Sequence, residues 1–285
     1  MRENPKVTVL MAVRDAGPYL GDAVDSILRQ SFEDFEFLIV DDASTDGSAA
    51  IAESYRDPRI RLERTGRSLG LAECLNRAMA LARGEFVARM DADDVSLPSR
   101  LEKQVAHLQS HPECAVVGVK MELMSPGGEP LGSWQEDDLT TTFEEIRRQL
   151  PKGNCIAHAG VMVRTDVLRR YRYRPRRSAQ DYDLWLRMCA DGTRIEKLDE
   201  RLLMYRCHPD SVSAKRRTNR TALQVNLEIR WRFLLERLRR GQLNRFVWRV
   251  LIRAALDQLV QWGRRLKGGV RGLRGRLRRS VAPGL

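Results

Sequence analysis

Three aspartates lie within four positions of the segment VARMDADDVSLPSRLEKQ, residues 87–104. Asp91 and Asp93 are separated by one residue, so an extended chain places both carboxylates on one side. Carboxylate oxygens are the hard ligands that Mg²⁺ or Mn²⁺ takes, and such an ion neutralises a diphosphate. The alternative is a solvated loop that caps the helix expected at 98–110, and the spacing alone does not decide between the two.

A second acidic pair, Asp41 and Asp42, follows the apolar run FEFLIV and opens the polar turn DDASTDGS. Both acidic groups come directly after strand-like runs. In open α/β sheets, ligands bind at the carboxyl ends of strands. We therefore expect the two groups to face one crevice, with capping of the next helix as the alternative role for Asp41 and Asp42.

Strand-like and helix-like segments alternate in the first part of the chain. The apolar runs of buried strands lie at 6–13, 35–40, 59–64 and 85–89, and helical periodicity covers 18–30, 47–56, 69–82 and 98–110. This alternation predicts an α/β fold with βαβ units and a mostly parallel sheet. Beyond residue 113 the pattern predicts strands at 114–123, 159–164, 194–198 and 201–208, and helices at 141–150 and 181–190.

The ordered set of motifs resembles that of the family 2 glycosyltransferases. The matching segments are VTVLMAVRDAGPYLGDAVDSILRQSFEDFEFLIVDDASTDGS, GLAECLNRAMALARGEFVARMDADDVSLPSRLEKQ, IAHAGVMVRTDVL, QDYDLWLRM and YRCHPDSVS. The resemblance implies a GT-A fold, which is Rossmann-like with a mostly parallel sheet flanked by helices. It covers residues 1–213 as one domain, with a nucleotide-binding part at about 1–110 and an acceptor-binding part at about 111–213.

The resemblance also implies contacts to the nucleobase. Ala12, Val13 and Asp15 match the family's base-contacting segment, although this chain has AVRD where the family usually has a proline and then an aromatic or Asn pair. Asp42 matches the residue that hydrogen-bonds the base, with Asp41 beside it. An aspartate that accepts an imide N–H suits uracil or thymine, and of the two we expect a UDP-sugar as the donor.

Three further residues match the metal side of the family's site. Asp91 resembles the contact to the ribose and the metal, and Asp93 resembles the direct metal ligand. His208, in YRCHPDSVS, matches a position that often faces the diphosphate or the metal. The resemblance thus implies Mg²⁺ or Mn²⁺ as cofactor, with Asp94 as a capping residue and a structural role as the alternative for His208.

The segment QDYDLW resembles the family's EDYDLW, in which the aspartate after the glutamate is the general base. The matching residue is Asp181, preceded here by Gln180. An acceptor hydroxyl is a poor nucleophile, and a positioned carboxylate can take its proton during attack on the anomeric carbon. The alternative for Asp181 is capping of the helix at 181–190, and Asp183 is the neighbouring candidate for the same role.

The implied function is inverting, metal-dependent transfer of a sugar from a nucleotide-sugar to a hydroxyl of a glycan or lipid-linked glycan, in bacterial polysaccharide and cell-envelope biosynthesis. One alternative is a nucleotidyltransferase that forms nucleotide-sugars on a related fold. It would need a Gly-rich basic loop after the first strand, which AVRDAGPYL does not provide. A non-catalytic peripheral membrane or anion-binding protein is the other alternative, and it leaves the acidic strand ends unexplained.

Charge is distributed unevenly along the 285 residues. Residues 214–285 contain 20 Lys and Arg against three acids, a net charge of +17, which leaves −5 for residues 1–213 within the total of +12. The pattern predicts a basic helical extension at 214–285, interrupted by Gly241. The predicted helical stripes are Leu223, Leu227, Trp231, Leu234 and Leu238 on the apolar side, Arg245, Arg249, Arg253 and Asp257 on the polar side, and Val270, Leu273 and Leu277 near the end.

An apolar face with arginines at four-residue spacing, as in residues 243–262, is typical of a helix on a membrane surface or on a partner protein. We expect residues 243–279 to contact an anionic membrane surface. Packing on the core and a homo-oligomer interface remain open as alternatives. Nucleic acid is not an expected partner, because charge alone supports it.

The cysteines and the apolar runs bear on the compartment. The five cysteines show no CxxC spacing, which indicates neither a disulfide framework nor a zinc site and favours a reducing compartment. The N-terminal apolar run is too short for a signal peptide, and the longest run without charged side chains, 153–163, is too short to span a membrane. We expect cytoplasmic localisation, with the tail at the inner face of the cytoplasmic membrane.

Overall fold

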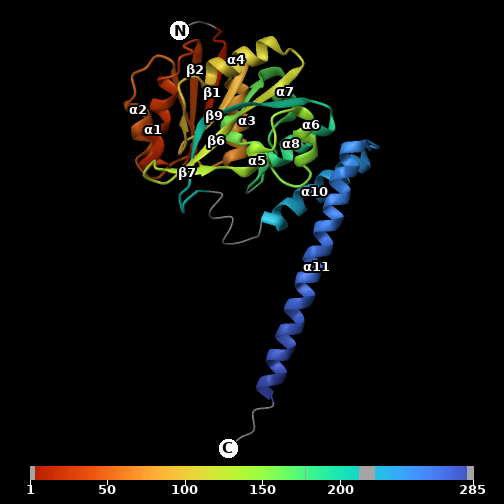
Figure 1. Ribbon diagram of the computed structural model, residues 1–285. Coiled ribbons are helices and arrows are strands. Elements are labelled where there is room, and N and C mark those ends of the chain that lie inside the picture. Colours follow the sequence, from red (N-terminus) through yellow and green to blue (C-terminus); the bar gives the residue numbers. More distant parts are fainter. Residues whose placement is uncertain (1–3, 177, 212–221, 281–285) are drawn as a thin grey trace, which may run out of the picture. The chain divides into compact units, whose positions relative to one another are not determined.

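The computed structural model describes residues 4–176, 178–211 and 222–280, with side chains described as far as Gly263. The chain divides into two compact units, residues 1–219 and 220–285 (Figure 1). The predicted boundary at 213/214, as well as the side chains of Val270, Leu273 and Leu277, lies outside the described residues.

The first half of the first unit is a parallel sheet covered by helices, as predicted. Its strands, in spatial order β3-β2-β1-β4, are β1 (Val7–Val13), β2 (Phe35–Asp41), β3 (Ile60–Arg64) and β4 (Phe86–Asp91). Its helices are α1 (Gly17–Leu28), α2 (Ser48–Ser54), α3 (Leu71–Leu81) and α4 (Arg100–Ser110). In the parallel register Val13 lies opposite Asp41, and Ala12 lies opposite Asp91 on the other side. Adjacent strands thus bring the predicted site residues to one edge.

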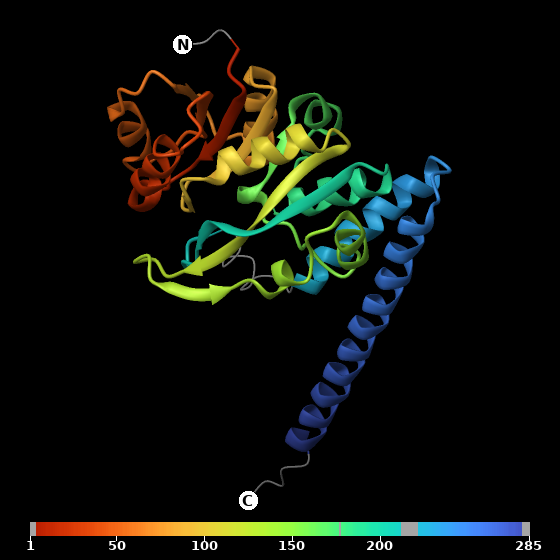
Figure 2. The ribbon, with the colours of Figure 1, turned by 45° about the horizontal axis from the view of Figure 1, so that its top comes forward.

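The second half extends the same sheet with mixed pairing. Its strands are β5 (Val95–Ser96), β6 (Cys114–Met124), β7 (Pro130–Ser133), β8 (Met162–Arg164) and β9 (Arg194–Arg206), and its helices are α5 (Gln135–Asp138), α6 (Phe143–Gln149), the 3₁₀ helix η1 (His158–Gly160), α7 (Thr165–Tyr171) and α8 (Gln180–Ala190). β8 runs antiparallel to both β4 and β6, whereas β6 and β9 are parallel and lie side by side (Figure 2). β6 therefore runs in the same direction as β4.

One expectation for this half is wrong, because the two strands predicted at 194–198 and 201–208 form the single strand β9. The ladder with β6 passes from Leu198 opposite Val119 to Arg201 opposite Lys120. Residues 199 and 200 form a bulge there. These two residues are polar, so the apolar pattern of the sequence breaks at the bulge, although the strand itself continues through it.

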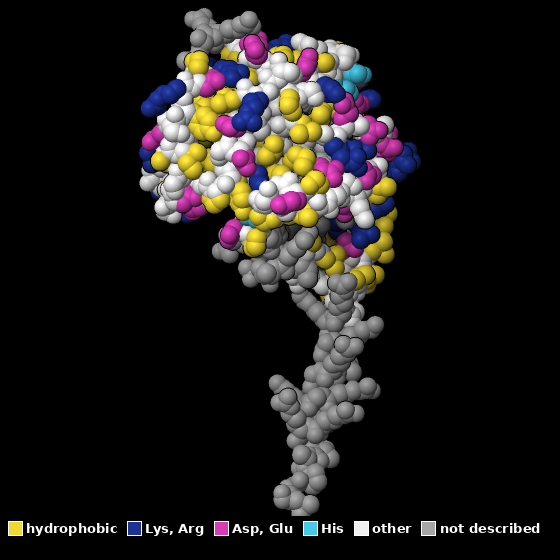
Figure 3. Space-filling view, turned by 60° about the vertical axis from the view of Figure 1, so that its left-hand side comes forward, with side chains coloured by type: hydrophobic (Ala, Val, Ile, Leu, Met, Phe, Trp, Pro, Cys, Tyr) yellow, Lys and Arg dark blue, Asp and Glu magenta, His cyan; other side chains and the backbone are white. Residues whose placement is uncertain are grey.

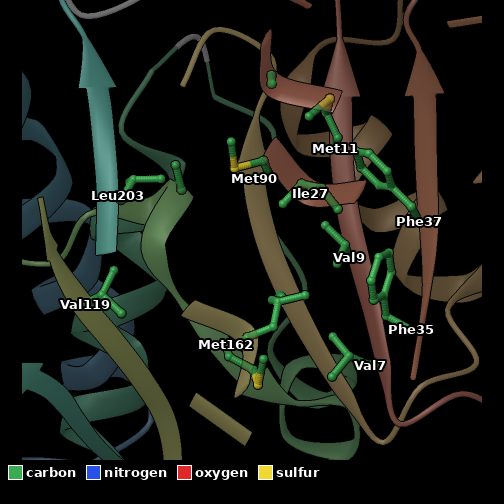
Figure 4. Packing of buried hydrophobic residues seen from close by; sticks show 14 of the residues in the cluster. Val7, Val9, Met11, Ile27, Phe35, Phe37, Met90, Val119, Met162 and Leu203 are labelled. Carbon is green, nitrogen blue, oxygen red and sulfur yellow. The ribbon is translucent and has the colours of Figure 1, made fainter. Parts of the chain in front are cut away.

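Buried apolar side chains of both strands and helices hold the first unit together. Val7, Val9 and Met11 of β1 are fully buried and lie beside Phe35 and Phe37 of β2 (Figure 4). Almost every residue of β1 and β2 is buried, on both faces of the sheet. Such strands occur where helices cover both faces, which is why their sequences are continuous apolar runs.

The second unit consists of two helices, α10 (Ala222–Arg239) and α11 (Arg245–Ser280). Gly241, with φ +65°, ends α10 as predicted. The rings of Phe233 and Phe246 pack edge to face with centroids 6.5 Å apart. Among the described residues, no helix combines the length and the apolar character needed to cross a bilayer.

Three predicted details of these helices are wrong. Leu238, expected on the apolar stripe of α10, is exposed, whereas Ile229 and Phe233 are buried. Asp257, expected on a polar stripe, is buried and lies 2.5 Å from Arg230 Nη1. The helix expected at about 243–262 continues to Ser280.

Candidate functional site

Hydrogen bonds join the loops that follow β1 and β2. Asp15 Oδ1 accepts from the backbone N–H of Thr45 at 2.7 Å, and the N–H of Asp15 donates to Ser44 Oγ at 3.1 Å. Asp15 has φ +50°, a left-handed conformation that Asp tolerates better than most residues. Together with the strand register, these bonds hold Ala12, Val13 and Asp15 beside the end of β2.

Asp42 is engaged by the chain that leads into α3. Its carboxylate accepts from the N–H groups of Leu69 at 2.6 Å and Gly70 at 2.9 Å, and from Ser68 Oγ at 3.0 Å. Gly70 has φ +82°, which favours glycine at this position. Burial would raise the pKa of Asp42, but these hydrogen bonds outweigh it and lower the pKa below its ordinary value. Asp42 therefore orders the start of α3, whereas capping of the next helix, α2, was the expected alternative.

Asp41 differs from its neighbour. It is 1% exposed, and its Oδ2 accepts no hydrogen bond. Arg64 Nε lies 3.7 Å from that oxygen. Of the two aspartates at the end of β2, Asp41 thus keeps an oxygen that, among the described residues, accepts no hydrogen bond and has only Arg64 at ion-pair distance.

The acidic loop after β4 brings three carboxylates together. One oxygen each from Asp91, Asp93 and Asp94 lies within 4.8 Å of the others. The buried Arg89 donates to Asp91 Oδ1. Burial and the charge of Asp91 raise the pKa of Asp93, and burial together with both neighbouring charges raises the pKa of Asp94 well above its ordinary value. Carboxylates with raised pKa values and short separations are a favourable environment for a cation.

The end of β9 and the residues after it hold this loop from the other side. His208 Nε2 lies 3.0 Å from Asp93 Oδ2. The N–H of Arg206 donates to Asp94 Oδ1 at 3.0 Å, and its guanidinium donates to the carbonyl of Asp93 at 2.9 Å. The acidic loop therefore brings together the three predicted metal ligands, Asp93, Asp91 and His208. The same loop contains Asp94 Oδ2, a buried oxygen that accepts no hydrogen bond from the described residues.

The predicted base Asp181 lies in the first turn of α8 and is partly exposed. Its Oδ2 accepts from Asn154 Nδ2 at 2.6 Å. The N-cap residue of α8 is Ala179, with φ +56° and no side-chain capping bond, so Asp181 is not the N-cap, and its charge lies within the first turn. Asp183 is fully buried and pairs with Arg187 at 3.0 Å, so it is closed to an acceptor. Geometry therefore favours Asp181 over Asp183.

Tyr173 is a buried residue near the predicted base. Its hydroxyl is 2.9 Å from His158 Nε2. Burial raises the pKa of Tyr173, the charge of Arg89 lowers it, and the charges of Asp181 and Asp91 raise it. The hydroxyl is therefore within electrostatic range of Asp181 on α8 and of Asp91 at the end of β4.

Sequence reasoning missed the residues that hold these carboxylates in place, namely Arg89, Asn154, Tyr173 and Arg206. A charged residue inside the apolar run FVARMD was a signal for Arg89, since buried arginines are rare without a partner. Asn154 and Arg206 gave no such signal, because their partners are distant in the sequence.

Comparison with known proteins gives consistent matches. Residues 8–172 match the family described as Glycosyl transferase family 2. EpsE of Bacillus subtilis is 37% identical over 229 residues, which cover 76% of this chain and 78% of EpsE. The O-antigen biosynthesis glycosyltransferase WbnJ of Escherichia coli is 34% identical over 214 residues, covering 72% and 81% of the two chains.

Solved structures show the same fold. S. aureus TarS in complex with UDP-GlcNAc has a TM-score of 0.67 at 22% identity, covering 82% of this chain and 66% of that chain. The mannosyltransferase PcManGT from Pyrobaculum calidifontis, in complex with GDP-Man and Mn²⁺, has a TM-score of 0.63 at 18% identity and covers 92% and 76%. The predicted GT-A arrangement of the sheet and helices is thereby confirmed.

Proposed function

The chain belongs to glycosyl transferase family 2 and is a glycosyltransferase, and we propose that it transfers a sugar from a UDP-sugar to a hydroxyl group of a glycan or lipid-linked glycan. The observation that carries the proposal is the acidic loop after β4, in which one oxygen each of Asp91, Asp93 and Asp94 lies within 4.8 Å of the others and His208 contacts Asp93. Asp181, partly exposed in the first turn of α8, is the acid available on the acceptor side.

The donor side supports a nucleotide-sugar. TarS is bound to UDP-GlcNAc and to UDP, whereas PcManGT is bound to GDP-Man. The proposed nucleobase contacts are those at the ends of β1 and β2, namely Ala12, Val13, Asp15, Asp41 and Asp42. Because Asp42 already accepts several hydrogen bonds, Asp41 is the better acceptor for an imide N–H of uracil.

Asp91 and Asp93 would hold the metal ion, with His208 beside Asp93. The ion, Mg²⁺ or Mn²⁺, supplies charge neutralisation of the departing diphosphate. The loop fits a cation because its carboxylates repel one another and Asp94 keeps an unsatisfied oxygen. Arg89 orients Asp91, and Arg206 fixes the backbone of the loop.

On the acceptor side, Asp181 would take the proton of the attacking hydroxyl. Asn154 holds Oδ2 of Asp181 and so fixes the orientation of the carboxylate. A single displacement at the anomeric carbon inverts its configuration. Because Gln180 replaces the family's glutamate, Asp181 lacks an adjacent negative charge at that position. The basicity of Asp181 therefore depends on its partners in the fold.

The names of the relatives support a polysaccharide acceptor. WbnJ is named for O-antigen biosynthesis, and TuaG of Bacillus subtilis, 30% identical over 214 residues, is named for teichuronic acid biosynthesis. We therefore place this enzyme in bacterial cell-envelope polysaccharide synthesis, with a glycan or lipid-linked glycan as the acceptor.

We further propose that α11 lies on an anionic membrane surface at the inner face of the cytoplasmic membrane. Between residues 248 and 262 its outer face carries large apolar side chains that are about half exposed, namely Trp248 52%, Ile252 59%, Leu256 53%, Leu259 59%, Val260 49% and Trp262 56%. Residues 264–279 add eight Lys and Arg and no acid. Apolar insertion and attraction to anionic lipid act together in such helices.

Glycine content supports a surface-dependent helix. Five glycines lie between residues 263 and 275. Each lowers helix stability by about 1 kcal/mol relative to alanine. A bilayer surface would compensate this loss.

The first unit differs from the basic residues 264–279 in its charge distribution. Basic and acidic side chains are interspersed on the face shown in Figure 3.

The test separates donor binding from transfer. Asp93→Ala should weaken Mn²⁺-dependent UDP binding by at least about 10-fold in calorimetry, since even partners of metal ligands affect affinity this strongly. Asp181→Asn should keep UDP affinity and reduce sugar transfer by roughly 10²–10⁴. Asp166→Asn, which changes an exposed carboxylate on α7, is the matched control and should change neither.

Two results would contradict the proposal. Metal-dependent UDP binding that is unchanged in Asp93→Ala would remove the acidic loop from the donor site. Release of pyrophosphate from UTP and a sugar phosphate, without sugar transfer, would instead identify a nucleotidyltransferase.

A further inference from the structure

A second group of metal-ligating side chains lies outside the donor site. His107 comes from α4, Cys114 is the first residue of β6, and Glu196 is the third residue of β9. One ligand atom of each lies within 4.8 Å of the others, and His107 Nε2 is 2.9 Å from Glu196 Oε2. The fold thus brings together three residues that are separated by up to 89 positions.

This cluster is at the sheet edge opposite the acidic loop. Asp91 ends β4, and β6 runs parallel to β4, so the start of β6 lies at the other edge. β9 runs parallel to β6, with Glu196 near its start and Arg206 at its end. The cluster of His107, Cys114 and Glu196 and the acidic loop are therefore at opposite ends of the sheet and can be tested separately.

From this geometry we propose that His107, Cys114 and Glu196 form a zinc site. Imidazole, thiolate and carboxylate are the three donor types that proteins offer to Zn²⁺. A thiolate ligand disfavours Mg²⁺, so the site differs in chemistry from the all-oxygen loop of aspartates. One thiolate and one carboxylate balance the two positive charges of the ion, so the partly buried site has no net charge once Zn²⁺ is bound.

The surrounding contacts suit a ligand role for Glu196. Its Oε2 faces His107, whereas its Oε1 accepts from Arg194 Nε at 2.6 Å. Ligating carboxylates in metal sites are hydrogen-bonded by outer partners in this way, which fixes their orientation. Arg194 can keep Oε1 while Oε2 turns from the imidazole to the ion.

The thiol must lose its proton when the ion binds. Cys114 is fully buried, and its Sγ donates to the carbonyl of Val116 at 3.2 Å. Burial and the charge of Glu196 raise the pKa of this thiol to about 12. Formation of the Zn–S bond therefore releases one proton to solvent, and zinc affinity should fall as the pH falls because protons compete for the sulfur.

Zinc is usually bound by four ligands at the corners of a tetrahedron, and a water molecule would be the fourth ligand here. The side chains of His107 and Glu196 keep 17% and 12% exposure, which leaves solvent access. His111 lies one turn further on, with its ring stacked on His107 at a centroid distance of 4.3 Å and its Nδ1 3.0 Å from the His107 carbonyl. Its ring stacks beside that of His107 and does not join the three ligands, so His111 provides a matched control.

The experiment is a Co²⁺ titration of the full chain after removal of bound metal. Cobalt bound to a thiolate absorbs in the near ultraviolet through sulfur-to-metal charge transfer, whereas cobalt on oxygen ligands does not. We expect this band, its bleaching by Zn²⁺, and its loss in Cys114→Ser. His107→Ala should lower Zn²⁺ affinity by at least about 100-fold, the upper end of the effect of losing an outer partner.

Three controls locate the site. Asp93→Ala should keep the band, because it affects only the acidic loop. Cys207→Ser should keep it, because Cys207 follows the end of β9, whereas Glu196 lies near the start of that strand. His111→Ala should also keep it. Absence of the band in the unmodified chain, or its persistence in Cys114→Ser, would overturn the proposal.

A second measurement covers the case in which Cys114→Ser fails to fold. Zn²⁺ should raise the melting temperature of the unmodified chain, since a ligand that binds the native state stabilises it. The increase should be kept in Asp93→Ala and lost in Glu196→Gln. An increase that survives in Glu196→Gln but not in Asp93→Ala would assign zinc binding to the acidic loop and refute the second site.

Discussion

We expect replacement of Asp42 by asparagine to reduce stability, and to reduce it more than replacement of Asp41. Two backbone N–H groups, those of Leu69 and Gly70, donate to the Asp42 carboxylate at 2.6 and 2.9 Å. An asparagine keeps one acceptor oxygen and presents an NH₂ group where the other was. One hydrogen bond to a charged acceptor, worth about 1.5–3 kcal/mol, is therefore lost. Asp42→Ala loses both, at a cost of about 3–6 kcal/mol.

The assay is thermal unfolding of the full chain followed by far-ultraviolet circular dichroism. In a unit of this size about 1 kcal/mol corresponds to roughly 2–4 °C in melting temperature, so Asp42→Asn should melt roughly 3–12 °C lower. The pKa of Asp42 is below its ordinary value of 3.8 in the folded state. Its contribution is therefore present above pH 3.8 and lost as the pH falls through the lower folded value, and the two proteins should converge in acid.

The paired variant Asp41→Asn provides the comparison. Asp41 Oδ2 accepts no hydrogen bond, so its loss should leave the melting temperature within a few degrees while weakening UDP binding. The reasoning is refuted by the opposite pattern, in which Asp42→Asn melts like the unmodified chain and loses UDP affinity. That result would make Asp42 the reader of the base, as the family resemblance implies.

Three further outcomes are expected. Glu36 is buried among Thr8, Arg61 and Arg83; burial would raise its pKa, but hydrogen bonds to these residues lower it below 4.5. Glu36→Gln should therefore lower the free energy of unfolding by about 1.5–3 kcal/mol at neutral pH. Urea unfolding should show this difference shrinking as the pH falls below 4.5 and through the lower pKa of the folded state. Arg206→Lys should weaken Mn²⁺-dependent UDP binding by about 10-fold in calorimetry without a change of fold by circular dichroism, because a lysine cannot bridge Asp93 and its other partners. Replacing the exposed apolar residues of α11 by glutamine, Trp248, Ile252 and Leu259 together, should release the protein from anionic vesicles in cosedimentation, whereas glutamine at exposed Leu131 should not. Equal partitioning of the two variants would exclude membrane docking by this face.

The parallel half of the fold could be predicted from the sequence because its signals are local. Apolar runs of strand length alternate with helical segments, and each strand from β1 to β4 lies where the pattern places it. The later half was harder to predict because its features do not appear in the local sequence pattern. β5 has only two residues, and the bulge in β9 places Asp199 and Glu200 within a strand. Neither feature produces a periodic pattern of apolar residues.

The positions of the acidic residues of the candidate site could be predicted from the sequence, whereas the residues that contact them could not. Asp91 and Asp93 stand at a strand end, and the sequence shows that directly. The bond between His208 and Asp93 joins residues 115 positions apart, and such pairs follow from topology. The engagement of Asp42 by the start of α3 has the same origin. The cysteine spacing indicated no zinc site, because the proposed ligand Glu196 reaches Cys114 only through the pairing of β9 with β6.

The place of β9 in the sheet has a consequence for biosynthesis of the protein. Asp94 is fixed by Arg206, which follows it by 112 residues, and β5 pairs with β9 through Val95 and Met204. At roughly 5–20 residues per second, a ribosome needs roughly 6–22 s to extend the chain from one to the other. During that interval the parallel half can fold, but the aspartate loop has no anchor on its second side. The strand that anchors the aspartate loop is the last of the sheet to be made, so a nascent chain that stops before it would hold a folded parallel half with an aspartate loop that lacks this anchor.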